Sequence, residues 1–277
     1  MTIGNAIVLG LVQGLAEFLP ISSSGHLSIL NNLFGMTTTE SGHLFFDVLL
    51  HLGTLLSICI VYWEDIVAMF FEVLGFVNVG PLAGERRARY PAARLFFMIC
   101  VATLPLLLIL PVKSMMDGLF YNNYFIGAML VLTGCMLYVS DKMTEGKKTV
   151  GGMSVWDALI IGLCQCVAAV PGLSRSGTTI TAGVATGLKR DSAVKFSCRM
   201  SLPAVLGANV LSIADAAKEG IDWSCMPAYL IGMAVAMVSG IAAISLIKYV
   251  ADRGRFGGFA YYCWVVGVLS IILTMIF

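Results

Sequence analysis

Two stretches with one pattern, GLVQGLAEFLPISSSG at residues 10–25 and GLCQCVAAVPGLSRSG at residues 162–177, divide this chain into related halves. They align without a gap at an offset of 152 positions, and seven of the sixteen residues are identical. Shared apolar composition does not produce matched Gln, Ser and Gly, so the match indicates an internal repeat. We predict repeat one at about 1–140 and repeat two at about 150–277, within a single integral membrane domain over 1–277.

Each stretch interrupts a longer apolar run, residues 3–34 in the first half and 155–188 in the second. Proline removes a backbone donor and disfavours helix in the residue before it. Pro20 and Pro171 both stand beside Ser and Gly clusters. We therefore expect each run to form two short helices joined by a bend. Re-entrant hairpins, which enter and leave on one side of the membrane, are favoured over the alternative of two kinked spanning helices.

The composition is that of a membrane protein. Hydrophobic residues make up 58% of the 277 and charged residues only 12%, against about 25% charged in soluble domains. A net charge of +1 without a basic stripe argues against nucleic-acid partners. Bilayer crossings need about 20 apolar residues, and five charge-free runs approach this length: 48–63, 95–112, 118–140, 226–247 and 256–277.

A sixth run, residues 200–214, becomes long enough if Lys195 and Arg199 extend to the surface. The predicted fold class is therefore an all-α polytopic membrane protein. It has about six transmembrane helices plus two re-entrant helical hairpins, arranged as an inverted-topology repeat.

The basic residues decide the orientation through the positive-inside rule. With the loop that holds Arg86, Arg87 and Arg89 in the cytoplasm, 14 of the 17 Lys and Arg residues lie inside. Only Lys113 and Lys218 lie outside, and one further arginine falls in the second bend. If the two interrupted runs crossed the membrane fully, the basic residues would no longer lie mainly on one side. We predict a multi-pass plasma-membrane protein with both termini extracytoplasmic and a site reached from that side.

The two bends form a candidate anion site. The second short helix of each pair begins at its bend, where its free N–H groups and positive dipole end face the middle of the protein. Two such termini around one cavity favour phosphate. Hydroxyl groups beside them could bind this phosphate or simply cap the helices: Ser22, Ser23, Ser24, Ser174, Ser176, Thr178 and Thr179.

Arg175 and Glu17 are charged residues within apolar stretches that we expect to lie in the membrane, where burying a charge costs free energy. A guanidinium at this depth needs an anion, and its planar fork matches phosphate oxygens. An ion pair with Glu17 is the alternative, and both partners could serve in turn. Glu17 follows Gln13 by four residues, one helical turn. Oxygen ligands from these two, with phosphate oxygens and waters, would suit Mg²⁺ or Ca²⁺.

His26 is a candidate catalytic base. It follows Ser23 by three residues and is close enough to accept a proton from its hydroxyl or to protonate a leaving group. His43 and His51 are interpreted as ordinary polar residues.

Residues 13–26 and 171–179 resemble the two signature motifs of the undecaprenyl-diphosphatase family, the bacitracin-resistance type of undecaprenyl pyrophosphate phosphatase. The resemblance covers nearly the whole chain. It implies a bacterial plasma-membrane enzyme that hydrolyses undecaprenyl diphosphate, uses a divalent cation and confers bacitracin resistance. On motif positions it implies catalytic roles for Glu17, Ser23 and His26, and phosphate handling by Ser174, Arg175 and Thr179.

We therefore expect phosphoryl transfer on a polyprenyl diphosphate whose tail stays in membrane lipid. Ser23 either attacks the terminal phosphorus or positions a water that does. The rival hypothesis is a polyprenyl-phosphate transporter or flippase, because broken helices in inverted repeats also build secondary transporters. Ser23 and His26 favour chemistry, since translocation needs only the anion site. The glycine-rich face 232–240 could pack a partner in a homodimer or a neighbouring helix.

Overall fold

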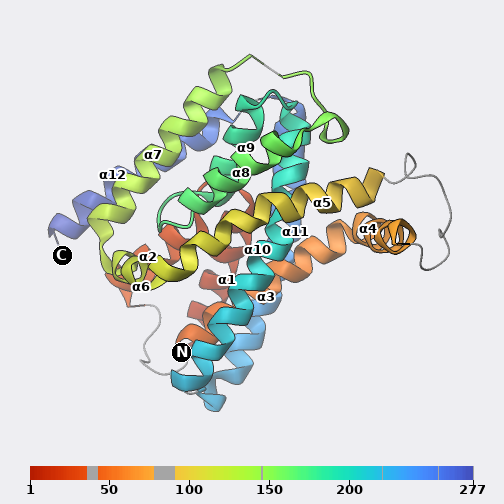
Figure 1. The fold of residues 1–277 in the computed structure, drawn as a ribbon. Coiled ribbons are helices and arrows are strands. Elements are labelled where there is room, and N and C mark those ends of the chain that lie inside the picture. The colour runs from red at the N-terminus through yellow and green to blue at the C-terminus, as the bar shows by residue number, and fades with distance from the viewer. Residues whose placement is uncertain (36–42, 78–90, 145, 220, 255, 277) are drawn as a thin grey trace.

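The computed structural model describes residues 1–35, 43–77, 91–144, 146–219, 221–254 and 256–276. These residues are almost entirely helical, which confirms the predicted all-α class (Figure 1). The α-helices follow one another as α1 (Ile3–Phe18), α2 (Ser23–Phe34), α3 (His43–Val61), α4 (Trp63–Phe76), α5 (Pro91–Thr103), α6 (Lys113–Asp117), α7 (Asn123–Lys142), α8 (Val155–Val167), α9 (Arg175–Ala185), α10 (Arg190–Glu219), α11 (Met226–Asp252) and α12 (Gly257–Ile276).

Six helical stretches among the described residues are long and apolar enough to cross a membrane, as predicted. They are Leu44–Val61, Pro91–Tyr121, Asn123–Lys142, Arg190–Ala216, Trp223–Asp252 and Gly257–Ile276. The weakest expected span, 200–214, is the core of the much longer α10. Lys195 and Arg199, which the extension placed at the surface, form ion pairs: Lys195 with Asp191 at 2.9 Å, and Arg199 with Asp65 at 2.6 Å.

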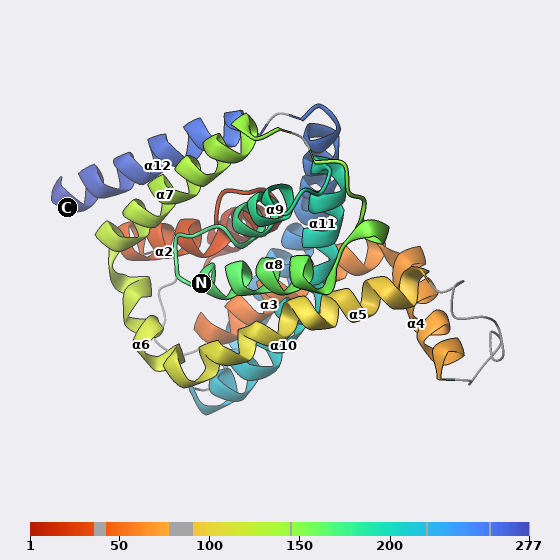
Figure 2. The same ribbon diagram turned by 45° about the horizontal axis from the view of Figure 1, so that its top comes forward.

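Both interrupted runs form two helices joined by a bend, as predicted. α1 and α2 flank the first bend, and α8 and α9 flank the second. The helices of each pair contact one another, and Figure 2 shows α9 returning alongside α8. With 16 and 13 residues, α1 and α8 are shorter than a crossing requires. Their length therefore favours hairpins over spanning helices.

Two parts of the fold differ from the predicted elements. No element was expected at α4, whose 14 residues include Glu64, Asp65 and Glu72 and are too few to span. In the second expected span, α5 ends at Thr103 and a 3-10 helix, η2 (Leu104–Val112), continues it. The change comes at Pro105, because proline lacks the N–H that an α-helical hydrogen bond needs.

Glycines let α1 and α8, the first helix of each hairpin, pack so closely against another helix that the two backbones are in contact. A Cβ on Gly10 of α1 would come within 2.5 Å of the Gly232 carbonyl of α11. At the position that matches it in the repeat, a Cβ on Gly162 of α8 would come within 2.3 Å of the Ala102 carbonyl of α5. Such contacts are typical of small-residue interfaces in membranes. The 232–240 face is thus covered by α1 and α3 of the same chain.

The two bends meet inside the bundle. A Cβ on Gly25 would lie 3.0 Å from Gly172 Cα, and a Cβ on Gly177 would lie 3.3 Å from Pro20 Cβ. Ser176 Oγ donates a hydrogen bond of 3.0 Å to the Leu19 carbonyl. Each bend therefore supports the other, while α7 and α12 lie side by side at one edge of the bundle (Figures 1 and 2).

Some of the basic residues on which the predicted orientation depends are not described by the structure. Arg86, Arg87 and Arg89, which anchor it, and Arg255 lie outside the described residues. The repeat boundaries at about 140 and 150 stay a prediction.

Candidate active site

The first bend begins α2 with a strained serine. Ser22 has φ 71° and ψ 97°, a left-handed conformation that L-residues rarely adopt. Its hydroxyl accepts a hydrogen bond of 3.2 Å from the Gly25 N–H, the usual N-cap contact. The N–H groups of Ser23 and Ser24 belong to the first turn, where a helix supplies no acceptor.

The second bend repeats this arrangement at the matching positions. Ser174 caps α9 by accepting a hydrogen bond of 3.1 Å from the Gly177 N–H. Gly172 adopts φ 88°, and a Cβ there would come within 2.6 Å of the Ile126 carbonyl, so only glycine fits. The expected pair of helix N-termini is therefore present, and Ser22 and Ser174 serve as caps.

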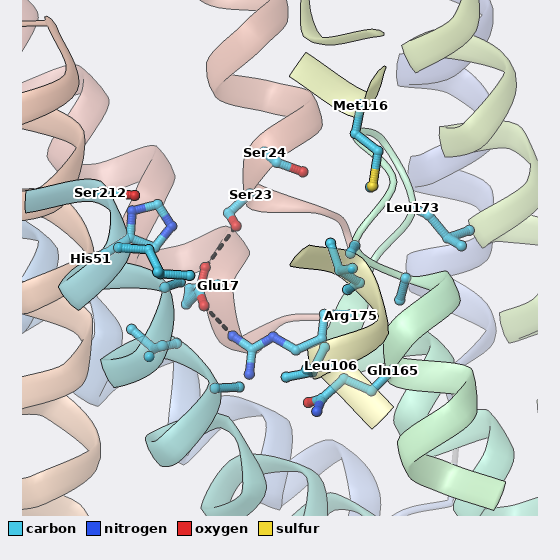
Figure 3. A pocket seen from close by; sticks show the side chains of 18 of the residues that line it. Glu17, Ser23, Ser24, His51, Leu106, Met116, Gln165, Leu173, Arg175 and Ser212 are labelled. Atoms are coloured by element: carbon cyan, nitrogen blue, oxygen red, sulfur yellow. Dashed lines mark hydrogen bonds and ion pairs between the residues drawn. The ribbon is translucent and has the colours of Figure 1, made fainter. Parts of the chain in front are cut away.

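Glu17 joins the two bends. Its buried carboxylate accepts hydrogen bonds from Gln13 Nε2 at 3.1 Å and from Ser23 Oγ at 2.7 Å, both through Oε2. Oε1 forms an ion pair with Nη2 of Arg175 (Figure 3). The structure thus brings four predicted site residues together, from two segments about 150 positions apart in sequence. The Glu17–Arg175 ion pair, given above as the alternative to a bound anion, is present in the structure.

A cavity of about 620 Å³ opens beside this cluster, a volume typical of small-molecule sites. One end is polar and is lined by Glu17, Ser22, Ser23, Ser24, His51, Gln165, Ser174, Arg175 and Ser176. The other walls are mainly apolar and come mostly from η2 and α10, with Leu106, Leu107, Ile109, Leu110, Val205, Ala208 and Leu211. Thr103, Lys113, Asp117 and Ser212 also line them. Leu107, Leu110 and Leu211 are also exposed on the protein surface. The cavity therefore opens sideways, on the flank of the bundle between η2 and α10.

His26 does not lie against Ser23, contrary to expectation. Its Nδ1 is 2.8 Å from the Ser22 carbonyl oxygen and its Nε2 is 2.9 Å from the Tyr262 hydroxyl. The ring also stacks on Tyr262 of α12. Both ring nitrogens are therefore engaged on the side away from the cavity, and Glu17 is the group that contacts the Ser23 hydroxyl.

Thr179 also lies away from the cavity. Its hydroxyl donates to the Arg175 carbonyl at 2.9 Å and is 2.6 Å from Ser197 Oγ of α10. Ser176 lines the cavity, but its hydroxyl is used for the contact with the first bend. Among the groups predicted to bind phosphate, Arg175 and the first-turn N–H groups of α2 and α9 remain for an anion.

His51, which we interpreted as an ordinary polar residue, lines the cavity beside Glu17 (Figure 3). Its Nδ1 is 2.8 Å from the Asp47 carbonyl oxygen, so this nitrogen carries a hydrogen and donates it. A signal for His51 existed in the sequence. It is an ionisable residue within the otherwise charge-free run 48–63, and such residues are functional candidates by default.

Comparisons with known proteins show the family of this chain. A family model described as Bacitracin resistance protein BacA matches residues 6–269. An undecaprenyl-diphosphatase of Desulforapulum autotrophicum is 38% identical over 276 residues, covering 98% of both chains. One from Halothermothrix orenii is 36% identical over the full length of both. One from Methanobrevibacter smithii is 38% identical, covering 97% of this chain and 96% of its own.

Proposed function

Because the chain belongs to the BacA family of bacitracin resistance proteins, we propose that it hydrolyses undecaprenyl diphosphate to undecaprenyl phosphate and inorganic phosphate. This reaction renews the lipid carrier for peptidoglycan and other envelope polymers, and it removes the target of bacitracin. The observation that carries the proposal is the contact of Ser23, Glu17 and Arg175 at the polar end of a cavity that opens sideways.

The cavity suits a lipid with a charged head. A polyprenyl tail can remain in the bilayer and pass between η2 and α10, where Leu107 and Leu211 line the opening. The diphosphate then meets the polar end. Arg175 offers it a planar fork of donors, and the N-termini of α2 and α9 add N–H groups.

The geometry assigns the proton of the Ser23 hydroxyl to Glu17. In the covalent route, Ser23 Oγ bonds to the terminal phosphorus and its proton passes to Glu17 Oε2, 2.7 Å away. The bond between this phosphorus and the bridging oxygen breaks, and lipid monophosphate leaves. Water then hydrolyses the phosphoserine. In the direct route, Ser23 orients a water, and Glu17 accepts the proton of that water instead.

Arg175 changes partner during this sequence. In the structure it neutralises Glu17. A diphosphate offers more negative charge and a matching pair of oxygens, so Arg175 would turn to the substrate and stabilise the charge that develops on its oxygens. Glu17 is then free to accept the proton.

A divalent cation, Mg²⁺ or Ca²⁺, is part of the proposal. Gln13 Oε1 is buried without a hydrogen-bond partner in the described part of the chain, and its amide contacts Glu17. Carboxylate and amide oxygens suit such ions. No cluster of three His, Cys, Asp or Glu side chains is found among the described residues, so substrate and water would complete the shell. When bound, the ion would offset charge on the phosphate oxygens.

Phosphate release in detergent micelles tests the proposed function. Purified protein with undecaprenyl diphosphate should release inorganic phosphate, and a chelator should stop it until Mg²⁺ or Ca²⁺ is restored. Micelles have no two sides, so a flippase would release nothing there. Absence of release from folded protein with either ion would contradict the proposal. Acid quenching during turnover separates the routes, since only the covalent one leaves phosphate on Ser23.

The orientation is a further part of the proposal. The charge sorting places both termini and the opening of the first hairpin on the extracytoplasmic side. A tag added after Phe277 should therefore react with a membrane-impermeant reagent in intact cells. Reaction only after lysis would reverse the orientation. A homodimer stays a prediction without an assigned surface, because α1 and α3 cover the 232–240 face.

A further inference from the structure

Gln165 is a buried side-chain amide on the cavity wall that has no hydrogen-bond partner among the described residues. It lies on α8, is 1% exposed and lines the cavity wall. Neither its Oε1 nor its Nε2 has a hydrogen-bond partner within the described residues. Native proteins rarely leave a buried amide unpaired on both atoms. An unpaired donor and acceptor at the polar end of a cavity indicate a ligand that supplies the missing bonds.

The internal repeat explains why this amide is free. Gln165 aligns with Gln13, whose Nε2 donates to Glu17 four residues later. The residue four positions after Gln165 is Ala169, which also lines the cavity. The second half thus keeps the amide and lacks the carboxylate that accepts its hydrogen bond in the first half. An anion that enters beside Ala169 would take the place of that carboxylate.

The position of Gln165 indicates which of the two phosphates of the substrate it would contact. Figure 3 shows Ser23 and Gln165 on opposite sides of the Glu17–Arg175 pair, with Leu106 on the Gln165 side. If Ser23 reaches the terminal phosphorus, a group beyond Arg175 is placed for the other phosphate, the one attached to the lipid.

We propose that Gln165 donates a hydrogen bond to the phosphate that remains attached to the lipid. The inference rests on the proposed function and adds a specificity-determining contact to it. This phosphate is present in the substrate, the transition state and the lipid product. A hydrogen bond to it therefore contributes to the binding of all three, and its loss should appear in KM more than in kcat.

The decisive experiment is Gln165→Leu, which removes both amide atoms and keeps an apolar side chain of similar size. Hydrogen bonds to charged groups are stronger than neutral ones, so we expect KM for undecaprenyl diphosphate to rise about tenfold to a hundredfold. Inhibition by undecaprenyl monophosphate should weaken by a similar factor. Inhibition by inorganic phosphate, which leaves the Ser23 end, should stay unchanged. Direct binding of the monophosphate to the protein in micelles gives a readout that does not depend on turnover.

Asn209→Leu is the matched control. Asn209 of α10 is 6% exposed, its Nδ2 also lacks a partner in the described chain, and it is not part of the cavity wall. Its replacement should leave KM and both inhibition constants unchanged. Gln165→Glu is the second variant: it keeps the shape, removes the donor and adds a negative charge, so it should bind the monophosphate less well than Gln165→Leu.

Three results would overturn the inference. They are an unchanged KM in folded Gln165→Leu, weakened inhibition by inorganic phosphate alone, or monophosphate binding by Gln165→Glu that equals wild type. The wild-type protein separates this failure from failure of the proposed function. If wild type releases phosphate and the Gln165 variants match it, only the role of Gln165 is wrong.

Discussion

Glu17→Gln should lower the rate of phosphate release from undecaprenyl diphosphate by about 10²–10⁴-fold, the usual contribution of a positioned acid or base. The substitution keeps the side-chain shape and can still accept one hydrogen bond. It cannot take up the Ser23 proton, and it loses the charge that neutralises Arg175 in the resting site. We expect the loss mainly in kcat. The measurement is steady-state release of inorganic phosphate in micelles, with folding checked by thermal denaturation.

Glu72→Gln is the control for this experiment. The Glu72 carboxylate also has defined partners, since it accepts hydrogen bonds from the N–H groups of Ala92 and Ala93 at 2.6 and 2.9 Å. It lies outside the cavity wall, so its replacement should leave kcat near the wild-type value. Near-normal turnover by folded Glu17→Gln would show that Glu17 is not the proton acceptor.

Arg175→Ala should reduce phosphate release by about 10³-fold, because it removes the donors that hold the diphosphate in a site shielded from water. Arg175→Lys keeps the charge and loses the fork, so a smaller loss of about tenfold to a hundredfold is expected. The alanine variant also leaves Glu17 as a buried, unpaired charge, which destabilises the fold. Glu17→Gln combined with Arg175→Ala should therefore melt at a higher temperature than Arg175→Ala alone.

Arg199→Ala is the matched variant, since Arg199 also forms an ion pair within a helix bundle. It pairs with Asp65 of α4 at 2.6 Å and is not among the cavity residues. Its loss should affect stability with little effect on KM or kcat. If Arg175→Lys had the same KM and kcat as wild type, as expected for Arg199→Ala, binding and cleavage of the diphosphate would not depend on the Arg175 guanidinium.

The fold could be predicted from the sequence because its determinants are local. A run of about 20 apolar residues needs no knowledge of its neighbours to be recognised as a span. Pro20 and Pro171, beside Ser and Gly, favour a break in the helix, and Ser22 and Ser174 cap the next helix through an N–H three residues away. The same local chemistry located both helix N-termini, and with them the candidate anion site.

The charges of the site were also predictable, because charge is scarce in this chain. Glu17 and Arg175 stand in apolar surroundings where each needs a partner, and few partners exist. The repeat brought their segments into register. These facts left two alternatives for Arg175, a bound anion or an ion pair with Glu17, and the structure shows the ion pair.

The side-chain directions came only from the tertiary structure. Spacing placed His26 near Ser23, yet a ring nitrogen binds Tyr262, 236 residues further along the chain. In the sequence, His51 stands out only as an ionisable residue in an apolar run, and Gln165 only as a residue matched in the repeat. Both line the cavity because α3 and α8 pack around α1 and α9. A local pattern determines where a helix begins and which charges are costly. Which atoms face the cavity depends on rotamers and on contacts between distant segments, and these exist only when the bundle is assembled.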